Sequence, residues 1–278
     1  MAKVAVKRSV VHKAAASLRK FMFPPKIELT PHDYMVFYYL QADNFMSIPV
    51  ICMVILFVMK ALDRIDPKAV VAAFKNHETS PPASLIEYFP RSFPAYRRIL
   101  NPAHGAFQEM VPWALLARDG FAVDSTVQWS DVSPSASDRS ISEPSMGSVD
   151  VEVAAVLQET LARHTSTPEE IYFLVWEGYA GLSDRYRLSA PVSVPYGRKM
   201  HAVLGSLSEV TSTDVASPLG VPLWWVAADG SWCVGNDVYA RSVFVGGSID
   251  CLRDISSDPK MESYAVDPAL TRVVPEDL

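Results

Sequence analysis

The sequence has few cysteines and no spacing of ligands typical of a metal site. Its three cysteines, Cys52, Cys233 and Cys251, form no CxxC pair and are too few for a disulfide framework. This usage is typical of a reducing compartment, so we expect a cytoplasmic protein, with membrane association as the alternative. The six histidines include no adjacent pair and no pair at i, i+4, which would form a zinc-binding helix face. We therefore expect no metal site.

The short motifs of common enzyme classes are also missing. No phosphate-binding GxxxxGK[ST], dinucleotide-binding GxGxxG, zinc-protease HExxH or nucleophile-elbow GxSxG occurs. The sequence therefore predicts no cofactor, and we assign no catalytic residue. What the chain does contain is apolar material, because 49% of its 278 residues are hydrophobic. That is enough to fold a large core without disulfides.

Charge is distributed unevenly along the chain. Residues 1–117 carry 14 Lys and Arg against 8 Asp and Glu, a net charge of +6. Residues 118–278 carry 11 against 23, a net charge of −12. The basic part is suited to an anionic surface or to the acidic part of the chain itself. The acidic part is unsuited to gripping phosphate backbones, so we expect no nucleic-acid partner.

The basic N-terminal segment, residues 1–80, contains an uncharged stretch from Asn44 to Met59. Its 16 residues are fewer than the roughly 20 that a membrane-spanning helix needs, and Pro49 lies within it. Its many β-branched residues favour a strand buried on both faces. The alternative is a membrane helix or an interfacial anchor over residues 44–62, which would make the membrane a partner.

The same segment resembles the N-terminal end of bacterial wax ester synthase/diacylglycerol acyltransferases. The resemblance covers about residues 28–76 and rests on Leu29–Asp33 and on Asp66-Pro67, which opens a predicted helix. That family uses a paired-histidine motif, HHxxxDG, in which a histidine acts as general base. This chain has no His-His pair. The resemblance thus implies an acyltransferase remnant or an enzyme of the O-acyltransferase type, with no catalytic residue carried over.

Residues 83–278 are predicted to form an α+β domain. The pattern indicates a mainly antiparallel sheet with hairpins and flanking helices. A short helix is predicted over Phe93–Leu100, and a loop over residues 130–147, which contain seven serines. Ser148 is predicted to cap the next helix. Ile171–Trp176 is apolar on both alternating faces and is predicted to be a central strand.

A hairpin is predicted around Asp229-Gly230, with a two-residue type I′ turn. In this register Trp225 lies opposite Val234, and Cys233 lies opposite Val226. One face then carries Leu223, Trp225, Trp232 and Val234, and the other carries Trp224 and Cys233.

A further strand is predicted over Ser242–Val245. It is followed by a turn at Gly246-Gly247 and by a helix capped by Ser248.

Residues 88–270 resemble an uncharacterised protein family that is abundant in actinobacteria. The resemblance rests on the order of several segments that contain tryptophan, glycine or proline. These are Ser92–Pro102, Ala162–Thr165, Trp176-Glu177-Gly178, Leu223-Trp224-Trp225, Trp232-Cys233-Val234 and Val245–Ser248. The resemblance implies a bacterial protein with no known activity.

Two groups of polar or glycine residues are candidates for a site. Gly246, Gly247 and Ser248 could offer backbone N–H groups to an anion, or could serve only the turn and the helix cap. Glu177 and Asp184 could form an acid–base pair, or could be solvated loop residues.

The remaining candidates are a cysteine and two tryptophans. Cys233 is a candidate nucleophile, or else a small buried residue of a strand. Trp224 and Trp176 could present aromatic surface to a partner, or Trp224 could pack against a covering helix. We expect a non-catalytic binding protein whose site includes Trp224, Trp176, Glu177 and the Gly246–Ser248 turn, with a protein or a small molecule as its partner.

Overall fold

The computed structural model describes residues 83–132, 140–187, 189, 191–194, 197–212 and 220–273. The predictions for residues 1–80, including the Asn44–Met59 strand or membrane helix and the acyltransferase resemblance, lie outside these residues. Part of the Ser-rich loop, residues 133–139, also lies outside them. Among the helices of the described ranges, none has the length and hydrophobicity to cross a bilayer.

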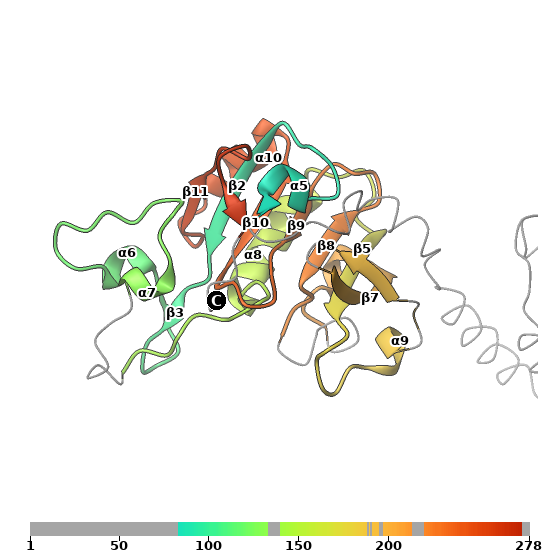
Figure 1. Ribbon diagram of the computed structural model, residues 1–278, viewed down its shortest axis with the longest axis horizontal. Coiled ribbons are helices and arrows are strands. Elements are labelled where there is room, and N and C mark those ends of the chain that lie inside the picture. Colours follow the sequence, from blue (N-terminus) through green and yellow to red (C-terminus); the bar gives the residue numbers. More distant parts are fainter. Residues whose placement is uncertain are drawn as a thin grey trace, which may run out of the picture. The chain divides into compact units, whose positions relative to one another are not determined.

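An eight-stranded sheet forms the centre of the described chain (Figure 1). Its order is β11-β2-β10-β9-β8-β5-β7-β6, and every neighbouring pair is antiparallel. The strands are β2 (Ala95–Leu100), β5 (Ile171–Trp176), β6 (Pro191–Val194), β7 (Arg198–Gly205), β8 (Trp224–Ala227), β9 (Cys233–Gly235), β10 (Ser242–Gly247) and β11 (Ser263–Ala265). With the flanking helices, this sheet confirms the predicted α+β fold.

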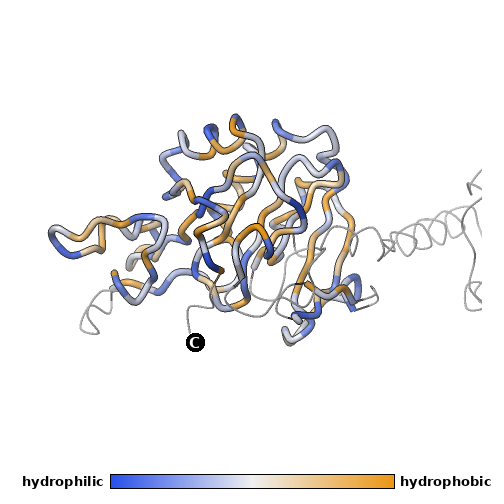
Figure 2. Tube along the Cα trace, turned by 45° about the horizontal axis from the view of Figure 1, so that its top comes forward, coloured by the Kyte–Doolittle hydropathy of each residue, from blue (hydrophilic) through white to orange (hydrophobic). Residues whose placement is uncertain are grey.

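Helices and two small strand pairs surround the sheet. The helices are α5 (Leu85–Tyr88), α6 (Trp113–Leu116), α7 (Trp129–Val132), α8 (Val151–Ala162), α9 (Asp184–Arg187), α10 (Ile249–Ser257) and the 3-10 turn η2 (Leu207–Glu209). The pairs are β1 (Ala83–Ser84) with β12 (Arg272–Val273), and β3 (Ala103–His104) with β4 (Met110–Val111). Figure 2 shows hydrophobic stretches running through the interior of the described chain and many hydrophilic stretches at its outer bends.

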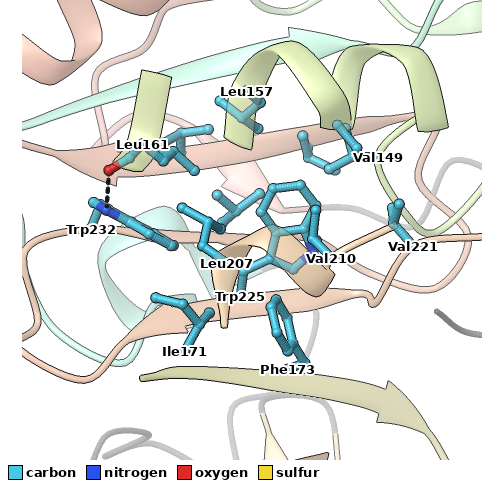
Figure 3. Packing of buried hydrophobic residues seen from close by; sticks show 14 of the residues in the cluster. Val149, Leu157, Leu161, Ile171, Phe173, Leu207, Val210, Val221, Trp225 and Trp232 are labelled. Atoms are coloured by element: carbon cyan, nitrogen blue, oxygen red, sulfur yellow. Dashed lines mark hydrogen bonds between the residues drawn. The ribbon is translucent and has the colours of Figure 1, made fainter. Parts of the chain in front are cut away.

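Helices α8 and α10 cover one face of the sheet. The apolar side of α8 buries Val153, Leu157 and Leu161 against side chains of the strands. Trp225 and Trp232 point to this face, and the indole Nε1–H of Trp232 donates to the Leu161 carbonyl at 3.1 Å (Figure 3). The bond gives a second partner to a carbonyl in the last turn of α8, which also accepts the His164 N–H at 3.0 Å.

The opposite face is covered by the single turn of α5 and by β12. Leu85, Tyr88 and Phe89 pack there against Trp224, and the cluster extends along the sheet to Met200. Because both faces are covered, the middle strands must be apolar on both sides. Ile171–Trp176 meets this condition and lies between β7 and β8, so the predicted central strand is confirmed.

The β8–β9 hairpin has the predicted register, with Trp225 opposite Val234 and Val226 opposite Cys233. Its turn differs from the prediction. A type I′ turn needs a positive φ at both Asp229 and Gly230, whereas only Gly230 has one, at 69°. The Gly230 N–H donates to the Ala227 carbonyl at 2.9 Å, so the connection is longer than two residues.

Two further details of this hairpin and of the next strand differ from the prediction. Leu223 lies in the core cluster of Trp224 and not in that of Trp225, because it precedes the strand, where the alternation has not begun. The predicted turn at Gly246-Gly247 is instead the end of β10, where these residues pair with Tyr96 and Ala95.

The helix predicted over Phe93–Leu100 is wrong, because Ala95–Leu100 forms strand β2 between β10 and β11. The two arginines of this strand find hydrogen-bond partners within the described chain. Arg97 Nη2 donates to the Ser263 carbonyl at 2.8 Å. Arg98 is buried, and its Nε donates to Ser242 Oγ at 2.8 Å. These partners lie far along the sequence, so no local pattern indicated the strand.

Helix caps were predicted in part. Ser248 caps α10, since its Oγ accepts the Cys251 N–H at 3.1 Å. Helix α8 is capped by Asp150 and not by Ser148, because the Asp150 carboxylate accepts the Glu152 N–H at 3.0 Å. In the loop predicted over residues 130–147, residues 130–132 belong instead to helix α7. Residues 140–147 contain no helix, and a single bridge joins Ser142 to His104.

The packing of α8 predicts a large difference between two truncations within that helix. Leu157→Ala should lower the free energy of unfolding by about 2–5 kcal/mol, because Leu157 is fully buried. Val151→Ala, at an exposed position of the helix, should change it by less than about 0.5 kcal/mol. Urea denaturation of both variants measures this difference, and equal losses would contradict the assignment of the buried face.

Candidate functional site

The predicted site residues lie in three different places. Trp176 and Glu177 lie at the end of β5, Trp224 lies in β8, and the Gly246–Ser248 segment joins β10 to α10. Trp224 is fully buried, so the predicted exposure of an aromatic face at Trp224 is wrong.

Helix α5 is the reason that Trp224 is buried. The Trp224 ring lies 5.3 Å from the Tyr88 ring and 5.5 Å from the Phe89 ring, measured between centroids. Another neighbour is Gly235, where a Cβ would lie 2.1 Å from the indole. Trp224 therefore packs in the core, as the alternative reading of this residue held. The covering turn precedes Trp224 by more than a hundred residues, so the hairpin sequence does not reveal it.

The Gly246–Ser248 segment has structural roles that account for Gly246 and Ser248. Gly246 lets two rings approach β10, since a Cβ there would lie 2.5 Å from Phe93 and 3.0 Å from Tyr96. Neither glycine has a positive φ, so no nest of N–H groups forms at a turn. The hydroxyl of Ser248 already binds the Cys251 N–H at the start of α10. These contacts favour packing and capping over anion binding.

The two cysteines of the described chain are buried. Burial raises the pKa of the Cys233 thiol well above its usual range and raises that of Cys251 to about 12. A nucleophilic cysteine needs the thiolate, which both environments disfavour. Cys233 is therefore a small core residue of β9, and the candidate nucleophile is rejected.

The acid–base pair considered for Glu177 and Asp184 does not form. Asp184 accepts a hydrogen bond from Arg187 at 2.7 Å, one turn along α9. Glu177 is exposed, and its Oε1 lies 3.9 Å from Lys199 Nζ. Each carboxylate thus has its own basic partner, and both side chains are solvated. Within the described residues, no group of three His, Cys, Asp or Glu side chains is placed to hold a metal ion.

Trp176 belongs to a cluster that the sequence did not reveal. We call it the aromatic–arginine surface, and it consists of Trp176, Tyr179, Arg198 and Tyr239. The Arg198 guanidinium carbon lies over two rings, 5.8 Å from the Trp176 centroid and 5.2 Å from the Tyr239 centroid. Trp176 and Tyr179 meet edge to face at 5.4 Å. The four residues come from the end of β5, the turn after it, the start of β7 and the loop after β9.

A buried carboxylate fixes the arginine of this surface. Asp237 is fully buried, and its Oδ2 lies 3.4 Å from Arg198 Nε. Asp237 Oδ1 accepts the Tyr239 N–H at 3.1 Å, and the Asp237 N–H donates to the Asn236 side chain at 2.8 Å. A buried charge needs such a partner, so Arg198 is held where it compensates Asp237. The Asp237 carboxylate thus holds both the Arg198 guanidinium and the Tyr239 backbone in position.

Parts of this surface stay accessible to solvent. Tyr239 is 37% exposed, and the Arg198 side chain is 24% exposed. Trp176 is half-buried, and its ring folds over Gly178, where a Cβ would lie 2.4 Å from the indole. The glycine of Trp176-Glu177-Gly178 thus makes room for the ring. Burial, followed by the charges of Asp237 and Tyr239, raises the pKa of Tyr179 to about 12, so this phenol stays neutral.

Trp176 was a candidate from the sequence, whereas Arg198, Asp237 and Tyr239 were missed. The missed residues lie 22 or more positions from Trp176 and share no motif. Only the pairing of β5 with β7, in which Trp176 lies opposite Met200, brings the start of β7 to the end of β5.

No protein-family model, curated protein or solved structure was found that matches this chain. The two family resemblances in the sequence therefore stay predictions.

The two glycines of β10 provide a matched pair of substitutions. Gly246→Ala should lower the free energy of unfolding by about 1–3 kcal/mol, because the new methyl group would overlap Phe93 and Tyr96. Gly247→Ala should cost less than about 1 kcal/mol, because its Cβ would meet Cys251 Sγ and Trp232 Cβ at an ordinary 3.5 Å. Thermal and urea unfolding measure both. A larger loss for Gly247→Ala would contradict the close approach at Gly246.

Proposed function

We propose that this chain is a non-catalytic binding protein, and that its aromatic–arginine surface binds an exposed segment of another protein. The observation that carries the proposal is the position of Arg198, over the rings of Trp176 and Tyr239 and against the buried Asp237. Tryptophan, tyrosine and arginine are the residues that most often dominate the binding energy of protein interfaces.

Preorganisation supports this function. An arginine loses much rotamer freedom when a partner binds it, which reduces affinity. Here Asp237 and the two rings already restrict Arg198, so less of that entropy is lost on binding. The exposed part of the Tyr239 ring adds apolar area beside the guanidinium, and rings of this kind contribute area at low entropic cost.

The chemistry of the surface favours binding over proton transfer. Arginine stays charged at all ordinary pH values, and the pKa of Tyr179 is raised to about 12. Neither group exchanges a proton readily near neutral pH, where a general acid or base works best. The acyltransferase and membrane-anchor hypotheses depend on residues 28–76 and 44–62, outside the described chain, and the surface adds nothing to them.

Tyr239→Ala tests this proposal without removing the partner of a buried charge. Peptides selected from a random display library against the full chain should include ligands that bind this surface. Their Kd should rise at least tenfold in Tyr239→Ala, because loss of a central interface ring costs about 2 kcal/mol. Fluorescence polarisation of a labelled peptide measures the change.

Phe107→Ala is the matched control, since Phe107 is an aromatic residue that is 92% exposed at another place. It should leave the Kd within about twofold. Arg198→Lys, which keeps the charge near Asp237 but loses the planar guanidinium, should weaken binding as Tyr239→Ala does. The proposal is overturned if no selected peptide depends on Tyr239, or if Phe107→Ala has an equal effect.

A further inference from the structure

His104 lies between the tip of the β3–β4 hairpin and the start of α8. Its Nε2 is 3.0 Å from Asp150 Oδ2, and its Nδ1 is 3.3 Å from the Gln108 carbonyl oxygen. Its side chain is 17% exposed. Both ring nitrogens therefore face an oxygen atom, one from α8 and one from its own hairpin.

Both of these oxygen atoms are acceptors. The Gln108 carbonyl has no proton to donate, and the Asp150 carboxylate accepts further hydrogen bonds from Ser145 Oγ at 3.1 Å and from the Glu152 N–H at 3.0 Å. A neutral imidazole has one N–H and would leave its other nitrogen lone pair against an oxygen. The imidazolium ion donates from both nitrogens and matches the site.

The hairpin tip is held in an unfavourable backbone conformation. Gln108 has a φ of 65°, the only positive φ of a non-glycine residue in the described chain. An L-residue rarely adopts this conformation unless its surroundings impose it. It closes the turn, where the Gln108 N–H donates to the Gly105 carbonyl at 2.9 Å, and the Gln108 carbonyl faces His104 Nδ1. The bond to His104 thus helps to keep Gln108 in this state.

The base of the hairpin is held in other ways. The backbone of His104 exchanges two hydrogen bonds with Ser142, at 3.1 Å and 2.7 Å. The Gly105 N–H donates to the Glu109 carbonyl at 3.0 Å. None of these bonds involves the imidazole. Loss of its proton would therefore affect residues 105–109 and leave the base of the hairpin in place.

We propose that His104 is a pH-operated clamp that fixes loop residues 105–109 to the start of α8 when it is protonated and releases them when it is neutral. The loop carries Phe107, so the clamp controls the position of an aromatic side chain that is 92% exposed. This inference is independent of the proposed function.

The charges around His104 set the direction of the pH dependence. Burial disfavours the imidazolium ion, but the Asp150 carboxylate, the Gln108 carbonyl and the charge of Glu152 favour it, and together they raise the pKa of His104 above 6.5. The acidic residue of its own hairpin, residues 103–111, is Glu109, whose carboxylate accepts the Phe107 N–H.

The segment of residues 140–147, which pairs with His104 through Ser142, contains one acidic residue, Glu143. The charge of Glu143 is compensated by Arg241, whose Nη2 lies 2.6 Å from Glu143 Oε2. A folded-state pKa above the unfolded value gives stability that is complete below about pH 6.5 and is lost as pH rises through the folded pKa. The loop should therefore be fixed at low pH and released at high pH.

An NMR titration of the full chain tests the clamp. The His104 ring signals, identified by their loss in His104→Gln, should titrate with a pKa above 6.5. The amide signals of residues 105–109 should shift with the same midpoint, and their hydrogen-exchange rates, corrected for the intrinsic effect of pH, should rise at least fivefold above it. In Asp150→Asn, which keeps a good helix cap, the pKa of His104 should fall to 6.5 or below.

Each outcome decides between the clamp and a passive histidine. The proposal is overturned if His104 titrates at or below 6.5 in the unmodified chain. It is also overturned if the amides of residues 105–109 do not respond at the midpoint of His104, or if Asp150→Asn leaves that midpoint unchanged. The other histidines of the described chain, His164 and His201, serve as internal references in the same spectra.

Discussion

Burial of the sheet on both faces is the constraint on which the rest of this structure depends. A strand covered on one side can alternate apolar and polar residues, but a strand covered on both sides cannot. Here α8 and α10 cover one face, and the short α5 together with β12 covers the other. Trp225 and Trp224, adjacent in β8, therefore point to opposite cores. The indole groups also connect layers, since Trp232 binds the carbonyl of Leu161 at the end of α8.

The same constraint determines where polar chemistry can occur. A charged side chain inside or beside such a sheet must find a partner, because an isolated buried charge is very costly. Arg98 meets backbone carbonyls and the Ser242 hydroxyl, and it ties the loop at residues 125–127 to β2. Asp237 forms an ion pair with Arg198 beyond the end of β9 and at the start of β7. There the core no longer covers the rings of Trp176 and Tyr239, which lie against the guanidinium. The aromatic–arginine surface is thus a consequence of compensating a buried carboxylate at the margin of the core.

Several patterns that depend on neighbouring residues were predicted correctly from the sequence, although the turn at Asp229-Gly230 and the Ser148 cap were not. Patterns that depend on distant partners were missed. The β5 strand, the register of the β8–β9 hairpin and the Ser248 cap follow from residues within a few positions of each other. Strand β2 was mistaken for a helix because its pairing partners are 140 or more residues away. Trp176 was a candidate from the sequence, but nothing in its vicinity indicates Arg198 or Tyr239, which join it only through the sheet.

One short segment connects the clamp at His104 with the aromatic–arginine surface. The segment is residues 145–150, in which the Ser145 hydroxyl donates to the Asp150 carboxylate, and this carboxylate also binds His104. Between Ser145 and Asp150 in the chain, Gly147 has a φ of 85° and donates its N–H to the carbonyl of Ala240, the residue after Tyr239, at 2.7 Å. A Cβ at Gly147 would lie 2.7 Å from the Val238 oxygen and 3.0 Å from the Tyr179 hydroxyl. Because the segment fits this closely, a displacement of its backbone would move contacts of both sites, whereas release of the 105–109 loop alone would leave it in place.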